Sequence, residues 1–368
     1  MNMFGAGSKT YPKPEGPVVQ AGMSKKSPEV RSMLVIHQGA LGDFILALPA
    51  LRSLRRAFPE AKSVIMGYPR ILELVEKRFY ADEILSVDQK GMASFFVPEG
   101  SLDFALSQVF GTFELVVVFG KDEKSALFRN LKRVCRGQIL HINSFPLPAG
   151  RIHLTDHLTR QFKGYDLLVE ELHPRLYLTE ADENWSKNLY NRKGLTAEEK
   201  PKAIVLHPGS GSKKKVWPIE RFVELVRYLQ GRSKSRILVA LGPAEGPEVQ
   251  KAFEGIEWDM GPVAPILLRG LSLPQLASVM KGCLLFIGND SGISHMAAAL
   301  GLATVAIFGP TDPNVWSPRG EKVAVVQGKI SCSPCSQENL FRCKQFKCLE
   351  GIEVGDVLEG VRRLGIET

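Results

Sequence analysis

The sequence lacks several features that would place it in a familiar class of protein. No apolar run approaches the length of a membrane span, and the longest, such as Leu115–Phe119, have the length of a β-strand. The N-terminus has no apolar block of the kind that marks a secretory signal, so we expect a cytoplasmic protein. No repeat of solenoid spacing is present. These absences disfavour membrane-spanning, secreted and repeat proteins.

Two common nucleotide-binding signatures are also missing. The dinucleotide fingerprint G-x-G-x-x-G is absent, which disfavours a Rossmann oxidoreductase, and no loop has the Gly-Lys-Ser/Thr order of a Walker A motif. The net charge of +8 is spread over many segments, and basic and aromatic residues do not alternate as in a single-strand nucleic-acid groove. The charge therefore favours a phosphorylated donor and an anionic membrane acceptor over nucleic acid.

The chain is long enough for two domains. It has 368 residues, of which 44% are hydrophobic and 23% charged, as in ordinary globular proteins. Residues 1–32 are rich in Pro, Gly, Ser and Lys without periodicity, so we expect a disordered tail, with Met23 or Met33 as alternative starts. Beyond this tail we predict one domain over residues 33–179 and a second over residues 180–368, which closes with a helix over Val354–Leu364.

Both predicted domains alternate short apolar strands with helical stretches. In the helix predicted over Asp43–Phe58, for example, apolar side chains recur on one face. The expected strands are Leu34–Ile36, Ser63–Met66, Leu115–Phe119, Gln138–His141, Ala203–Leu206, Arg236–Leu241, Pro265–Leu268, Leu284–Ile287 and Ala303–Phe308. Such alternation predicts an α/β fold with two parallel sheets, whose carboxyl ends face a cleft between the domains.

The segment from Gly288 to His295 is the most informative in the chain. It reads Gly288-Asn289-Asp290-Ser291-Gly292-Ile293-Ser294-His295 and lies between two apolar runs. This order predicts a strand, a tight turn and a helix start, whose unpaired N–H groups suit a phosphate. A carboxylate would repel that phosphate, so Asp290 is better suited to sugar hydroxyls. The segment indicates a nucleotide-sugar site, although an ordinary Asn-Asp helix cap has the same pattern.

Three further segments follow predicted strands. They are His37-Gln38-Gly39-Ala40-Leu41-Gly42-Asp43, the run from His207-Pro208-Gly209-Ser210 through Lys215-Val216-Trp217-Pro218, and Leu241-Gly242-Pro243-Ala244-Glu245. Gly39 and Gly42 permit a close turn and the approach of another molecule. Hydroxyls and lysines in the second segment suit phosphate oxygens. The alternatives are a helix cap at Asp43, a solvated basic loop at Lys213 and Lys214, and a dipole-favoured Glu245.

Taken together, these segments resemble the heptosyltransferases of glycosyltransferase family 9. The resemblance rests on the Gly42-Asp43 turn, the His-Pro-Gly-Ser loop that ends in Lys-x-Trp-Pro, and Asn-Asp-Ser-Gly-x-x-His followed by Phe308-Gly309-Pro310-Thr311-Asp312-Pro313. It covers residues 33–320 in order and spacing. It implies a GT-B fold of two Rossmann-like domains, and inverting, metal-independent transfer of heptose from ADP-heptose to the inner core of lipopolysaccharide.

The resemblance also assigns roles to residues. It implies that Asp43 is the general base, that Lys215 binds the donor diphosphate, and that Gly39 and Gly42 form the acceptor-side turn. The other residues it implies for donor binding are Ser210, Ser212, Glu245, Asp290, Ser291, Gly292 and His295. His37 departs from the family, which often has Arg or Lys there, so a contact with an acceptor phosphate at His37 depends on its protonation.

The implied acceptor is a core oligosaccharide linked to lipid A, so the enzyme would work as a peripheral protein at the cytoplasmic face of the inner membrane. On the first predicted helix, Arg52, Arg55 and Arg56 either steer the protein onto lipid phosphates or form an ordinary solvated helix face. Two other functions fit the same residues. One is transfer of another nucleotide-linked sugar to a surface glycan, and the other is non-catalytic binding of a nucleotide-sugar or nucleic acid.

Four of the six cysteines are concentrated in one segment, residues 332–348. Cys332 and Cys335 form a C-x-x-C pair, and Cys343 and Cys348 follow. This spacing suits a structural zinc ion, while reduced thiols without a metal are the alternative. We expect no disulfide in a reducing cytoplasm, and no cofactor for catalysis.

Overall fold

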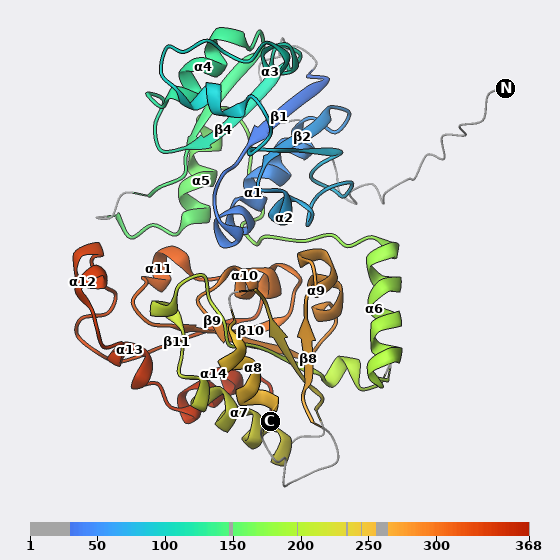
Figure 1. Ribbon diagram of the computed structural model, residues 1–368, viewed down its shortest axis with the longest axis vertical. Coiled ribbons are helices and arrows are strands. Elements are labelled where there is room, and N and C mark those ends of the chain that lie inside the picture. Colours follow the sequence, from blue (N-terminus) through green and yellow to red (C-terminus); the bar gives the residue numbers. More distant parts are fainter. Residues whose placement is uncertain are drawn as a thin grey trace, which may run out of the picture.

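The computed structural model describes residues 30–146, 150–196, 198–232, 235–243, 245–254 and 264–367. Two parallel sheets form the framework, one in each half of the chain (Figure 1). The first sheet has the order β3-β2-β1-β4-β5 and the second the order β11-β10-β9-β6-β7-β8. All of their strand pairs are parallel, as the alternation of strands and helices predicted.

The strands are short and mostly buried. Those of the first sheet are β1 (Ser32–Ile36), β2 (Lys62–Gly67), β3 (Glu83–Ser86), β4 (Leu115–Gly120) and β5 (Gln138–Asn143). Those of the second are β6 (Ile204–His207), β7 (Ile237–Leu241), β8 (Ile266–Arg269), β9 (Leu285–Asn289), β10 (Ala303–Phe308) and β11 (Val323–Gln327). Near-continuous apolar runs such as Ala303–Phe308, buried throughout, are typical of parallel strands covered on both faces.

Helices cover both sheets. In the first half they are α1 (Leu41–Ala57), α2 (Pro69–Leu72), α3 (Phe104–Phe110), α4 (Ala126–Val134) and α5 (Leu154–Lys163), with the 3-10 helix η1 (Met92–Phe96). In the second half they are α6 (Glu180–Lys193), α7 (Ile219–Arg232), α8 (Pro247–Glu254), α9 (Leu273–Met280), α10 (Gly292–Ala299), α11 (Pro313–Trp316), α12 (Gln337–Arg342), α13 (Lys347–Glu350) and α14 (Val354–Arg363), with η3 (Lys200–Lys202) and η4 (Lys213–Lys215).

The apolar core follows the two-residue period of the strands. In β1, Met33 and Val35 enter one cluster, whereas Leu34 and Ile36 enter another on the opposite face of the sheet. The first of these clusters continues through α1 into the second half, where it includes residues of α9 and α10. The two halves are thus joined by a shared apolar core, and α1 and α10 face each other at their junction (Figure 1).

The predicted elements are confirmed to within about two residues where the sequence pattern is strong, but β3 and β11 were missed. The predicted boundary after residue 179 lies just before α6, whose N-cap is Thr179. The predicted tail lies outside the described residues up to residue 29. For its last residues the prediction is wrong, because Val30 packs against the core and Ser32 begins β1. None of the described helices is long and apolar enough to cross a bilayer.

Candidate active site at the junction of the two sheets

Asp43 lies in the first turn of α1, where the helix faces the second half of the molecule. Its Oδ2 accepts a hydrogen bond from the backbone N–H of Ala40 at 3.1 Å. Burial raises the pKa of the carboxyl group above its ordinary value, and Asp290 acts in the same direction, whereas the Ala40 bond and Lys215 lower the pKa. A carboxylate with a raised pKa accepts a proton more readily than an exposed aspartate does.

Glycines bring the two helix starts into contact. A Cβ atom at Gly42 would lie 3.0 Å from Cδ2 of His295, and one at Gly292 would lie 2.6 Å from Cβ of Leu41. A larger residue at Gly292 would force Leu41 at the start of α1 to shift, and one at Gly42 would require the His295 ring to give way by a few tenths of an ångström. The turn containing Gly39 and Gly42 therefore meets His295 of the second half, and Asp43 is carried to the same junction.

Asp290 follows the end of β9 and is almost fully buried. Its Oδ2 lies 2.8 Å from Nζ of Lys215 and also accepts a hydrogen bond from Oγ1 of Thr311. The ion pair with Asp290 holds the Lys215 ammonium group beside the start of α10. The hydrogen bond from Thr311 fixes the orientation of the same carboxylate. Three segments that are far apart in sequence thus meet at one carboxylate.

The start of α10 offers unpaired backbone donors next to that lysine. Ser291 is the N-cap residue, and its side chain makes no capping bond but lies 3.3 Å from the hydroxyl of Ser294. The first N–H groups of a helix have no partner within the helix, and the helix dipole adds partial positive charge there. Together with Lys215, these groups form a site suited to phosphate oxygens.

The two serines predicted to bind phosphate already make backbone contacts. The hydroxyl of Ser210 donates to the backbone carbonyl of Asp290 at 2.7 Å, and Ser212 caps η4 by accepting from the N–H of Lys214 at 3.3 Å. Each oxygen retains capacity for a further hydrogen bond. In this structure, however, Ser210 holds the loop against the turn at Asp290 and Ser212 caps a 3-10 turn within the loop, and the contact of either serine with phosphate stays a prediction.

Glu245 lies after β7 and packs against Gly209 of the loop that follows β6. It is buried, accepts a hydrogen bond from the N–H of Gly242, and occupies the space where a side chain at Gly209 would have to fit. Gly209 is therefore required by the close approach of the carboxylate. The predicted contact of Glu245 with a ribose hydroxyl is not tested by these contacts.

The histidines at the junction are neutral near pH 7. Burial lowers the pKa of His37 to about 4 and that of His295 to about 4. His37 packs between Phe44 and Phe119, and its Nδ1 accepts from the N–H of Gly39 at 3.3 Å. An uncharged, enclosed His37 is unsuited to holding an acceptor phosphate. His295 is different, because its Nδ1 is buried and has no hydrogen-bond partner among the residues that the structure describes.

The arginines predicted to steer the protein onto a membrane do not form a free basic surface. Arg52 is buried and also donates to the backbone carbonyls of Glu171 and His173. The ion pairs are Arg52 with Glu171, Arg55 with Asp82, and Arg56 with Glu170. The prediction is wrong for Arg52, which cannot reach lipid, and the other two arginines lie against acidic partners that offset their charge.

Cys332, Cys335, Cys343 and Cys348 line one cavity of about 310 Å³. The thiol of Cys335 is directed at the carbonyl of Cys332, and that of Cys343 at the carbonyl of Gln345. Among the residues that the structure describes, no three His, Cys, Asp or Glu side chains are arranged to hold a metal ion. The thiols as placed do not form a tetrahedral zinc site, and zinc binding would require them to turn toward one another.

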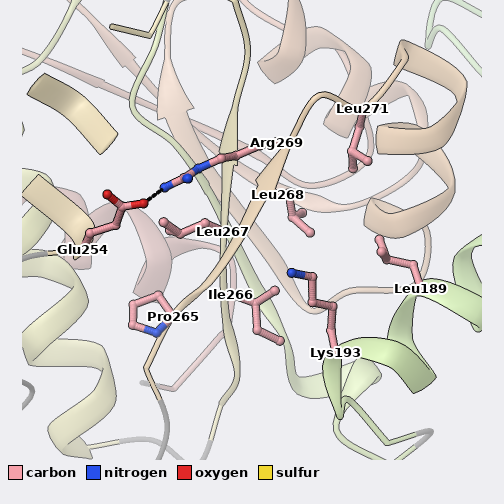
Figure 2. A pocket seen from close by; sticks show the side chains of 9 residues that line it. All are labelled: Leu189, Lys193, Glu254, Pro265, Ile266, Leu267, Leu268, Arg269 and Leu271. Carbon is pink, nitrogen blue, oxygen red and sulfur yellow. Dashed lines mark hydrogen bonds and ion pairs between the residues drawn. The ribbon is translucent and has the colours of Figure 1, made fainter. Parts of the chain in front are cut away.

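A cavity larger than the one at the cysteines lies elsewhere. It measures about 460 Å³ and lies along the edge strand β8 beside α6, with the Lys193 amine and the Arg269–Glu254 ion pair at its wall (Figure 2). Its lining contains none of the predicted site residues. The polar groups that suit a nucleotide-sugar converge instead at the junction of α1 and α10.

Sequence reasoning missed the contacts of two residues in the network at this junction. Asn289 is fully buried and contacts both ends of the loop between Pro208 and Trp217, and Thr311 bonds to Asp290. The motifs that contain them were recognised, but an asparagine in a strand or a threonine in a loop carries no signal of its contacts. Their positions next to Asp290 and in Gly-Pro-Thr-Asp-Pro were the available clues.

The chain matches glycosyltransferase family 9 (heptosyltransferase) over residues 151–344, just over half of its length. It is 23% identical over 338 residues to lipopolysaccharide heptosyltransferase 3 of Escherichia coli (strain K12). This alignment covers 88% of this chain and 95% of the E. coli protein. The crystal structure of a family 9 glycosyltransferase from Veillonella parvula DSM 2008 matches with a TM-score of 0.72 and 23% identity, covering 91% of this chain and 97% of that one.

The structure of E. coli ADP-heptose lipopolysaccharide heptosyltransferase II matches with a TM-score of 0.68 and 20% identity, over 90% of this chain and 98% of that one. The two parallel sheets are therefore those of the GT-B fold, as the resemblance in sequence implied. The fold and the matched residues lead to one conclusion: the chain belongs to glycosyltransferase family 9.

Proposed function

We propose that this glycosyltransferase moves heptose from ADP-heptose to the inner core of lipopolysaccharide, with inversion at the anomeric carbon. One observation carries the proposal. Asp43, whose pKa is raised by burial, lies on α1 directly across from α10, where Lys215 and Asp290 form an ion pair beside the helix start. A base and an anion site on opposite sides of one junction are the two groups that an inverting transfer needs.

In the proposed reaction, an acceptor hydroxyl attacks the anomeric carbon while the bond from that carbon to the diphosphate oxygen breaks. The hydroxyl proton passes to the Asp43 carboxylate, and the bonding electrons leave with ADP. Attack opposite the leaving group inverts the anomeric configuration. Removing a general base typically slows such a step by about 10²–10⁴-fold.

The leaving diphosphate gains negative charge as the bond breaks. Lys215 and the N–H groups at the start of α10 would stabilise this charge without having to move far, because the ion pair with Asp290 already holds the ammonium group there. When the donor binds, the phosphate oxygens would share Lys215 with Asp290. The Asp290 carboxylate would then be available to sugar hydroxyls.

Turnover with defined donors and acceptors tests the proposal. The purified protein is incubated with a core acceptor and ADP-heptose, or with a UDP- or GDP-linked hexose, and products are identified by mass spectrometry. Transfer from ADP-heptose alone would support the proposal, and NMR of the product linkage would report inversion. Transfer only from another nucleotide-sugar would show that the donor is that nucleotide-sugar and not ADP-heptose. No transfer from any donor would refute the function.

We propose that catalysis needs no metal ion, because a lysine and a helix start supply the positive charge that a metal would otherwise give. Activity should persist after treatment with EDTA.

The prediction of a structural zinc ion is separate from catalysis and is decided by metal analysis of the purified protein. About one zinc per chain that is lost in Cys332→Ser would support it, whereas metal-free protein of normal stability would refute it.

The proposed acceptor, an oligosaccharide on lipid A, places the enzyme at the cytoplasmic face of the inner membrane. The net charge of +8 favours weak, salt-dependent binding to anionic lipid. Flotation with anionic and neutral vesicles at low and high salt measures this binding. Recovery with anionic vesicles at low salt only is the expected result, and equal recovery with neutral vesicles would exclude an electrostatic encounter.

A further inference from the structure

Asn289, the last residue of β9, links two ends of the donor-site loop through its side chain. Its Oδ1 accepts a hydrogen bond from the backbone N–H of Trp217 at 3.0 Å. Its Nδ2 donates to the carbonyl of Pro208 at 2.8 Å and to that of Gly209 at 3.3 Å. The residue is completely buried, so these three backbone groups have no access to water through this side.

The loop between these contacts carries three of the predicted donor-binding residues, Ser210, Ser212 and Lys215. It leaves β6 at His207, passes through Ser210 and Ser212, forms η4, which ends at Lys215, and returns to the core at Trp217. Trp217 is itself buried, and its indole N–H donates to the carbonyl of Ile352 at 2.9 Å. The loop is therefore fastened at both ends, and the side chain of Asn289 bonds to the backbone at each of them.

Few side chains can replace an asparagine here. The amide presents one acceptor to an N–H group and two donors to carbonyl oxygens, which matches the three backbone partners. An aspartate has nearly the same shape, but it would set a carboxylate oxygen against two carbonyls. An alanine would leave three buried backbone groups without partners, each at a cost of roughly 1–3 kcal/mol.

We propose that Asn289 is a positioning residue that sets the affinity for the nucleotide part of the donor, by holding Lys215 and the start of α10 in register. Asn289 precedes Asp290 in sequence, and Asp290 both pairs with Lys215 and receives the Ser210 hydroxyl through its backbone carbonyl. The same short segment thus fixes the loop backbone and the lysine on it. This inference rests on the proposed function, since it takes the loop to bind a nucleoside diphosphate.

Asn130 provides a matched control in the first half of the molecule. It is a buried asparagine that also donates to two backbone carbonyls, those of Phe95 and Val97, at 3.0 and 2.9 Å. It lies on α4 and holds η1, with no residue of the predicted donor site among its partners. Asn130→Ala should therefore lower stability as Asn289→Ala does, without changing how the protein binds ADP.

The experiment measures ADP binding by calorimetry and donor kinetics for wild type, Asn289→Ala, Asn289→Asp and Asn130→Ala, well below each melting temperature. We expect both Asn289 variants to weaken ADP binding roughly tenfold or more, and to raise the donor KM more than they lower kcat. We expect Asn130→Ala to bind ADP as wild type does. Normal ADP affinity in a folded Asn289 variant would overturn the inference.

A second measurement needs no substitution and so does not depend on the variants folding. Hydrogen exchange of the ligand-free wild type should show the Trp217 amide protected like the amides of the sheet core, because it is buried and bonded to Asn289. Exchange as fast as at an exposed loop would overturn the inference. Wild type that fails to bind ADP at all would instead refute the proposed function, which separates the two failures.

Discussion

The turn after β1 and the turn after β9 each place an aspartate next to the start of a helix, and the two helices contact each other. Asp43 is held by one backbone N–H group and is otherwise enclosed, so burial raises the pKa of its carboxyl group. Asp290 is more deeply buried but carries an ion pair with Lys215 and a hydrogen bond from Thr311. The same residue type is thus suited to accept a proton in one turn and to position a cation in the other.

The surroundings account for this difference. In its own half of the molecule Asp43 lies near His37, which is neutral between two phenylalanines, and the charged groups that shift the pKa of Asp43, Lys215 and Asp290, belong to the other half. Near Asp290 the side chains of three loops converge, and most of their polar groups bond to the backbone. A carboxylate in the first environment remains reactive, whereas one in the second is committed to a network. Substitutions at the two turns should therefore have different kinetic signatures.

Asp43→Asn should have the largest effect on transfer. We expect the rate to fall by about 10²–10⁴-fold while ADP affinity is retained, because the amide keeps the shape but accepts no proton. Steady-state rates and calorimetry with ADP measure the two quantities. Asp103→Asn is the control, since Asp103 also caps a helix of the first half, by accepting from the N–H of Leu106 at 2.9 Å. A near-normal rate in Asp43→Asn would rule out its role as base.

Lys215→Ala should affect donor binding and transfer together. The diphosphate is charged before and during bond breaking, so we expect a higher donor KM and a lower kcat, each by roughly tenfold or more. The control is Lys213→Ala, because Lys213 is exposed on the same 3-10 helix. If Lys213→Ala weakens ADP binding more than Lys215→Ala does, the assignment of the diphosphate to Lys215 is wrong.

Thr311→Val should have a smaller effect of the same kind. The substitution keeps the branched shape and removes the hydroxyl that donates to Asp290, a neutral-to-charged hydrogen bond worth about 1.5–3 kcal/mol at most. Since Lys215 still pairs with Asp290, we expect only a several-fold rise in donor KM with little change in kcat. An effect on kcat as large as that of Asp43→Asn would mean that the second turn takes part in proton transfer.

The sequence predicted the framework of both turns more completely than their contacts. Strand-turn-helix patterns and glycines were sufficient to place Asp43 and Asp290 at helix starts on parallel sheets. Short edge strands such as β3 and β11 were missed. An edge strand of four or five residues is only partly buried, so it can form with little apolar pattern in its sequence. The roles of Asn289 and Thr311, and the pairing of Arg52 with Glu171, depend on contacts between distant segments, which local sequence does not encode.

The smallest predicted effects are opposite shifts in the pH dependence of transfer, and they test whether the two turns are coupled. In wild type, kcat/KM should fall with decreasing pH as Asp43 becomes protonated, at a pH above that expected for an exposed aspartate, because burial raises its pKa. Lys215 lowers the pKa of Asp43, so Lys215→Ala should move this acid limb to higher pH. Asp290 raises it, so Asp290→Asn should move the limb to lower pH. Each shift should be modest, about a pH unit or less, since both charges act through the polar junction.

The measurement is kcat/KM from pH 4 to pH 8 for the three proteins, with Lys213→Ala as the control for general loss of charge. Acid limbs that coincide in all variants would mean that the group titrating in the rate is not Asp43, or that the two turns act independently.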